Sequence, residues 1–134
     1  MNAPRPVVFV IDDDASVRRA LERLLRVEGF SVRTFASGSA FLGALDAACT
    51  GCAVLDVRMP DLSGFEILDR LAARGCTLPV ILITGHGDLT MAARAQHLGC
   101  VSFLRKPFED VALLEAVRRA LRCRREGDGA ETGG

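Results

Sequence analysis

Hydrophobic residues along the chain follow two alternating patterns, one typical of buried strands and one typical of amphipathic helices. Largely apolar runs predict four strands, at Pro6–Ile11, Cys52–Leu55, Pro79–Ile83 and Val101–Leu104, and Ser31–Phe35 is predicted as a further short strand. Apolar residues at three-to-four spacing predict five helices: Ala15–Val27, a helix capped by Ser37 and containing Phe41, Leu42 and Leu45, then Gly64–Ala73, Leu89–Leu98 and Asp110–Arg122. This alternation indicates a parallel sheet with helices on both faces, joined by right-handed crossovers.

Polar side chains follow four of the five predicted strands. They are Asp12, Asp13, Asp14, Asp56, Thr84 and Lys106. In an open parallel sheet, the ligand site lies beyond the carboxyl ends of the strands. We therefore expect these side chains to converge on one shallow pocket, although they span most of the chain.

Three adjacent aspartates after a buried strand are unfavourable unless something compensates their charge. Asp14 alone is explained as the N-cap of the following helix. The other acidic residues favour a divalent cation, because Mg²⁺ takes oxygen ligands and keeps several waters. Asp13 and Asp56 would each supply a carboxylate, and a backbone carbonyl near Arg58 would supply a third oxygen.

Asp56 is a plausible nucleophile toward phosphorus, since covalent aspartyl phosphates are a known use of this side chain. Phosphoryl transfer mainly needs charge neutralisation, which Mg²⁺, Lys106 and the Thr84 hydroxyl would provide. Lys106 is the only lysine among 17 basic residues. A compact ammonium suits a pocket that closes on one phosphoryl oxygen better than the planar guanidinium does. The glycine-flanked His86 is expected to be exposed and to influence the access of water.

Length and composition indicate one globular domain, predicted over residues 1–122. The 17 basic and 17 acidic residues balance, which argues against a dedicated nucleic-acid or membrane-surface binder. No apolar run is long enough to span a membrane, and the first residues do not resemble a signal peptide. The Gly-rich end predicts a linker or flexible tail over residues 123–134.

The chain contains five cysteines, Cys49, Cys52, Cys76, Cys100 and Cys123. Without a secretory signal, we expect reduced thiols in a cytoplasmic protein. Cys49 and Cys52 form a CxxC pattern, which leaves redox or zinc chemistry as an alternative. A buried free thiol at the start of a strand is the preferred interpretation for Cys52.

Taken together, four motifs resemble those of the receiver (phosphoacceptor) domain of bacterial two-component response regulators. The matching segments are Val10–Asp14, Val54–Gly64, Pro79–Gly87 and Phe103–Phe108. The resemblance covers about residues 6–122 and implies a flavodoxin-like five-stranded sheet of order 2-1-3-4-5. The residues of these motifs are most similar to those of regulators of the nitrogen-fixation and aromatic-degradation type, which have a helix-turn-helix output domain.

The resemblance also implies roles for individual residues. Asp56 would accept a phosphoryl group from the phosphohistidine of a sensor histidine kinase. Asp12 and Asp13 resemble the acidic pair, with Asp13 the direct Mg²⁺ ligand, and Thr84 and Phe103 resemble the switch pair. The phosphorylated form would change the surface of the fourth helix and fifth strand, a reasonable site for homodimerisation.

The resemblance further implies that Lys106 contacts the phosphoryl group and that the Lys106–Pro107 peptide bond is cis. Pro107 therefore belongs to the predicted switch region together with Thr84 and Phe103. Such a domain phosphorylates and dephosphorylates only itself, and an output domain absent from this chain would act on transcription.

Two other functions remain open from the sequence. A phosphohydrolase of the haloacid-dehalogenase type would use Asp12 as nucleophile and Asp14 as general acid, which leaves Asp56 unexplained. A pseudo-receiver would bind partners without phosphorylation, which leaves the full set of site residues unexplained.

Overall fold

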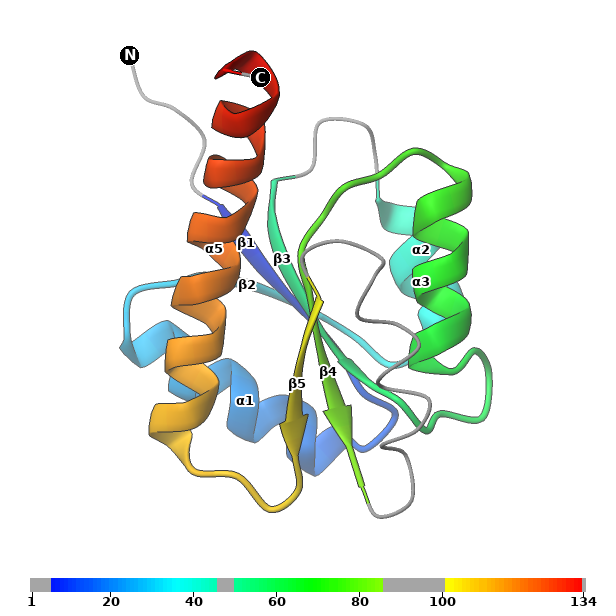
Figure 1. Ribbon diagram of the computed structural model, residues 1–134. Helices are drawn as coiled ribbons and strands as arrows, with labels where there is room; N and C mark the ends of the chain where they lie inside the picture. Colours follow the sequence, from blue (N-terminus) through cyan, green and yellow to red (C-terminus); the bar gives the residue numbers. More distant parts are fainter. Residues whose placement is uncertain (1–5, 46–49, 86–100, 134) are drawn as a thin grey trace.

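The computed structural model describes residues 6–45, 50–85 and 101–133. It contains a five-stranded sheet of order β2-β1-β3-β4-β5 in which every neighbouring pair is parallel (Figure 1). The strands are β1 (Val7–Ile11), β2 (Ser31–Phe35), β3 (Gly51–Asp56), β4 (Val80–Thr84) and β5 (Val101–Arg105). The predicted flavodoxin-like order 2-1-3-4-5 is confirmed.

Four described helices cover the sheet. They are α1 (Ala15–Val27), α2 (Gly38–Ala44), α3 (Gly64–Ala73) and α5 (Asp110–Gly133). Helices α1 and α5 lie on one face, and α2 and α3 lie on the other (Figure 1). The helix predicted over Leu89–Leu98 lies outside the described residues.

Each face of the sheet has its own hydrophobic core, because alternate residues of a strand point in opposite directions. Val8 and Val10 of β1 pack toward α1 and α5, while Phe9 and Ile11 pack toward α2 and α3. All four side chains are buried. A strand buried on both faces has no polar alternation, which explains why the sequence shows continuous apolar runs.

Short-range hydrogen bonds cap the helices, and the two predicted caps, Asp14 and Ser37, are both present. Asp14 caps α1 by accepting hydrogen bonds from the second and third backbone N–H groups of the helix. Ser37 caps α2, and Ser63 forms a capping box with Glu66 at the start of α3. Gly29 follows the end of α1 with φ of 93°, a conformation that favours glycine.

The last helix differs from its prediction. We expected Asp110–Arg122, whereas α5 continues to Gly133 and extends past the edge of the sheet opposite the strand carboxyl ends (Figure 1). The prediction was based on the inward apolar residues, of which Leu121 is the last. The helix is therefore longer than its apolar periodicity indicated. The assignment of 123–134 to a linker stays a prediction.

Cys52 and Cys76 are both free thiols. Cys52 is buried, and burial raises the pKa of its thiol to about 12. It therefore behaves as a small hydrophobic side chain, while Cys49, the other cysteine of the CxxC pattern, lies outside the described residues. Within the three described segments, no helix combines the length and the hydropathy of a membrane span.

Candidate functional site

Three carboxylates meet at the carboxyl edge of the sheet. Strands β1 and β3 are neighbours in register, with Ile11 opposite Leu55, so the next residues, Asp12 and Asp56, emerge side by side. One oxygen of each of these two side chains and one of Asp13 all lie within 4.8 Å of one another. Asp12 and Asp56 are buried, and Asp13 is exposed to solvent. Of the acidic residues predicted to converge, Asp12, Asp13 and Asp56 do so, whereas Asp14 lies outside this cluster.

Asp12 is the most deeply buried of the three carboxylates. Its Oδ1 accepts a hydrogen bond of 2.9 Å from the backbone N–H of Asp14, whereas its buried Oδ2 has no partner. Desolvation raises the pKa of Asp12, and repulsion from Asp56 adds to that effect. An unpartnered buried carboxylate oxygen costs free energy unless a proton or a cation compensates it.

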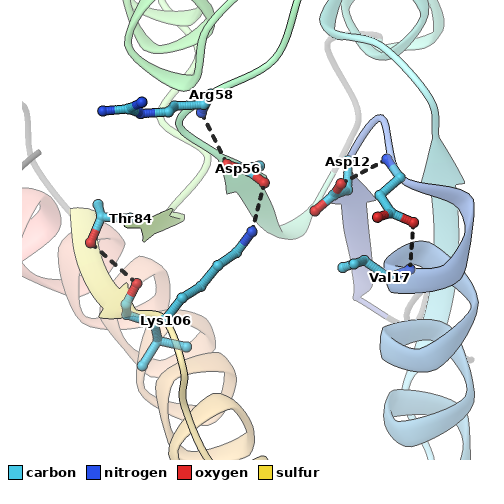
Figure 2. A network of polar contacts seen from close by, with 8 residues as sticks. Asp12, Val17, Asp56, Arg58, Thr84 and Lys106 are labelled. Atoms are coloured by element: carbon cyan, nitrogen blue, oxygen red, sulfur yellow. Dashed lines mark hydrogen bonds and ion pairs between the residues drawn. The ribbon is translucent and has the colours of Figure 1, made fainter. Parts of the chain in front are cut away.

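Both oxygens of Asp56 have polar partners. Nζ of Lys106 lies 3.1 Å from Oδ2, and the backbone N–H of Arg58 donates a 3.0 Å hydrogen bond to Oδ1. Figure 2 shows the Lys106 side chain reaching across from β5 to Asp56, while the Arg58 side chain points away from that carboxylate. Lys106 is half-exposed, so its ammonium is partly hydrated when no further ligand is present.

Of the predicted switch residues, Thr84 lies on β4, Phe103 lies on β5, and Pro107 follows β5. The buried Thr84 hydroxyl donates a hydrogen bond of 3.5 Å to the carbonyl of Leu104, so it is directed toward β5 (Figure 2). Phe103 is half-buried and packs against the core on the α2 and α3 side of the sheet. The Lys106–Pro107 peptide bond is cis, as the resemblance implied.

The acidic cluster fits a hard divalent cation. Its donors are carboxylate oxygens, and one of them, Oδ2 of Asp12, is buried without a hydrogen-bond partner. Mg²⁺ is usually bound through one or two carboxylates and keeps several of its waters, so two of the three aspartates are enough for direct coordination. Asp14 does not belong to this cluster, because its carboxylate caps α1.

Arg18 is part of the site but was not singled out from the sequence. Its guanidinium donates a 2.7 Å hydrogen bond to the backbone carbonyl of Asp12 and so supports the turn that presents the acidic residues. Its position near the start of a helix that follows three aspartates could have indicated a role in the site. However, α1 has several arginines on its polar face, and only the structure shows which one turns back.

Residues 8–118 match the response regulator receiver domain family. This match covers most of the chain, and the strand order and acidic edge described above agree with it. The chain belongs to the response regulator receiver domain family, whose members are signalling domains of two-component systems.

Two relatives are regulators of transcription or response regulators by name. The chain is 43% identical over 122 residues to response regulator protein TmoT of Ectopseudomonas mendocina, covering 91% of this chain and 56% of TmoT. It is 47% identical over 115 residues to transcriptional regulatory protein FixJ of Bradyrhizobium diazoefficiens, covering 86% of this chain and 56% of FixJ. The chain thus spans about half the length of the curated relatives that it matches.

A solved structure titled FixJ-N superposes with a TM-score of 0.82 and 41% identity, covering 90% of this chain and 96% of that one. The receiver fold is therefore shared along almost the whole length of that domain. The similarity to this type of regulator, which the motifs indicated, is confirmed.

Proposed function

We propose that this domain is a cytoplasmic, phosphorylation-controlled switch in which Asp56 accepts a phosphoryl group from a sensor histidine kinase. A carboxylate oxygen of Asp56 would form the new bond to phosphorus, and the bond from phosphorus to the histidine nitrogen would break. The observation that supports this most directly is the pairing of Asp56 with Lys106 at 3.1 Å beside two further carboxylates. That pairing combines a nucleophile with a cation able to neutralise the transferred group.

Mg²⁺ is the proposed cofactor. Asp13 and Asp56 would coordinate it directly, with the backbone carbonyl of Arg58 as a further oxygen ligand and Asp12 close by. When bound, the cation supplies positive charge beside the phosphoryl oxygens. Asp12 is suited to hold the cation or one of its waters through its unpartnered Oδ2.

Thr84 and Phe103 would couple phosphorylation of Asp56 to a conformational change at the surface. A phosphoryl group adds negative charge and acceptor oxygens, which would attract the Thr84 hydroxyl away from Leu104. That hydrogen bond is long, so little free energy opposes its exchange. The space vacated by Thr84 would allow Phe103 to turn inward and alter the surface near β5, including the segment at Pro107.

We further propose that the altered surface promotes homodimerisation and controls an output domain outside this chain that acts on transcription. The relatives support this, because they are transcriptional or response regulators about twice as long as the aligned region. Catalysis by the receiver domain itself would be limited to its own phosphorylation and dephosphorylation. The balanced net charge supports the absence of direct nucleic-acid contacts by this domain.

The decisive experiment is to treat the protein with a small phosphodonor, or with beryllofluoride, in the presence of Mg²⁺ and to map the modified residue. An adduct at Asp56 that disappears in Asp56→Asn is expected. An adduct at Asp12 would instead favour a phosphohydrolase of the haloacid-dehalogenase type. Unchanged partner binding and dimerisation by Asp56→Asn under phosphorylating conditions would favour a pseudo-receiver.

A further inference from the structure

The loop between β3 and α3 connects the proposed phosphorylation site to the rest of the fold. It begins at Arg58, whose backbone N–H is bonded to Asp56, and it ends at Ser63, the N-cap of α3. The backbone N–H of Gly64 donates a 3.0 Å hydrogen bond to the carbonyl of Val57, which closes the base of the loop. The loop is therefore anchored at both ends next to Asp56.

A third anchor lies at the middle of the loop. The carboxylate of Asp61 accepts a 3.0 Å hydrogen bond from the backbone N–H of Ser39, a residue 22 positions earlier in the chain. Ser39 lies in the first turn of α2, where backbone N–H groups have no acceptor within the helix. Hydrogen bonds from the Ser39 hydroxyl and backbone lower the pKa of Asp61, so it is a charged acceptor at neutral pH.

The surroundings of this anchor are closely packed. A methyl group at Gly38 would lie 2.7 Å from Ile67 and 3.0 Å from Leu62, so the start of α2 is in direct contact with α3 and the loop. A methyl group at Gly64 would lie 3.1 Å from the backbone oxygen of Asp56. A continuous packed path thus connects the start of α2 with the backbone at Asp56.

We infer that Asp61 is a positioning residue: its bond to Ser39 holds the loop so that the Arg58 backbone is presented correctly to Asp56 and to the cation. This inference rests on the proposed function, because it assumes that the Arg58 carbonyl is a ligand of Mg²⁺. Residues that support metal ligands from outside the coordination sphere typically contribute about 10–100-fold to metal affinity. Asp61 acts through a loop, so we expect a loss of about tenfold, at the lower end of that range.

The experiment measures Mg²⁺ affinity of the whole chain by calorimetric titration, together with the amide spectrum of ¹⁵N-labelled protein. Calorimetry is preferred because the chain has no tryptophan or tyrosine for a fluorescence assay. Asp61→Ala removes the acceptor and is expected to weaken Mg²⁺ binding about tenfold. It should also shift the Ser39 amide signal and speed its hydrogen exchange.

Two further variants distinguish the effect of the Asp61–Ser39 hydrogen bond from the effect of the Asp61 charge. Asp61→Asn keeps an acceptor oxygen without the charge, and we expect it to restore Mg²⁺ affinity to within about twofold of wild type. Ser39→Pro removes the donor from the opposite end of the same bond, at the second residue of α2, whose backbone N–H has no acceptor within the helix. It should match Asp61→Ala, and the double variant should lose no more than either single variant.

Asp69→Ala is the matched control for lost charge. Asp69 is exposed on α3, and its side chain makes no hydrogen bond or ion pair with the described residues. The Asp69→Ala protein should bind Mg²⁺ with the wild-type affinity. If Asp61→Ala does not fold, Ser39→Pro and Asp61→Asn still decide the question.

The inference is overturned if Ser39→Pro binds Mg²⁺ as tightly as wild type while its spectrum shows a folded domain. It is also overturned if Asp61→Asn is weakened as much as Asp61→Ala, because the effect would then come from charge. Absence of Mg²⁺ binding by the wild-type protein would instead refute the proposed function itself.

Discussion

Replacing Asp12 by asparagine tests whether repulsion within the acidic cluster destabilises the metal-free fold and whether a cation removes this effect. Two unit charges 4.8 Å apart repel by about 3.5 kcal/mol at an effective dielectric constant of about 20. Lys106 and solvent offset part of this repulsion between Asp12 and Asp56. We therefore expect Asp12→Asn to raise the free energy of unfolding of the metal-free protein by about 1–2 kcal/mol, or about 4–7 °C in Tm.

The amide of the variant keeps the favourable contact of the carboxylate. Its oxygen still accepts the hydrogen bond from the Asp14 backbone, and its NH₂ group points to the position of the unpartnered Oδ2. Mg²⁺ should reverse the order of stability. A ligand at about 100 times its Kd stabilises the folded protein by about 2.7 kcal/mol, a gain that we expect only for wild type.

The pH dependence follows from the raised pKa of Asp12, whose main cause is desolvation. The folded state holds this proton more tightly than the unfolded state, so the contribution of Asp12 to stability falls as pH rises from the ordinary aspartate pKa through the raised one. The difference in free energy of unfolding between Asp12→Asn and wild type should therefore be largest at neutral pH. It should disappear as the solution is acidified below pH of about 4.

The assay is thermal unfolding followed by circular dichroism in EDTA and again in excess Mg²⁺. Asp13→Asn is the control, because the exposed Asp13 is well hydrated and should give a smaller gain in EDTA. A metal-free Asp12→Asn protein that melts at or below the wild-type temperature would refute the reasoning.

Three further predictions follow from other parts of the fold. Lys106→Arg should still be phosphorylated but should not dimerise in response, and normal phosphorylation-dependent dimerisation would show that lysine is not required. Gly51→Ala should lower the free energy of unfolding by about 3 kcal/mol or more in urea titrations, because φ is 123° and the new methyl would collide with the Val7 carbonyl. Cys52 should react with a thiol reagent at neutral pH only after unfolding, while the half-buried Cys76 reacts in the native protein, as peptide mass spectrometry would show.

Local patterns were sufficient to predict most of the elements. The helix Ala15–Val27 begins after the predicted cap Asp14, and the helix Gly64–Ala73 has the bounds that its apolar spacing predicted. The end of α5 was missed because no apolar periodicity marks the last residues of that helix in the sequence. Strand ends differed by one residue at most, since apolar runs define burial better than they define pairing.

By itself, the sequence determined which chemical groups stand at the strand ends, and hence the class of site. Periodicity, caps and turn residues act over a few positions, so they are readable without knowing the fold. Only the tertiary structure decided which of these groups meet. Lys106 reaches Asp56 across 50 residues, and Asp61 reaches Ser39 across 22, because the parallel register aligns the carboxyl ends of distant strands. The burial that leaves Oδ2 of Asp12 without a partner also comes from packing around the sheet, which no local pattern reports.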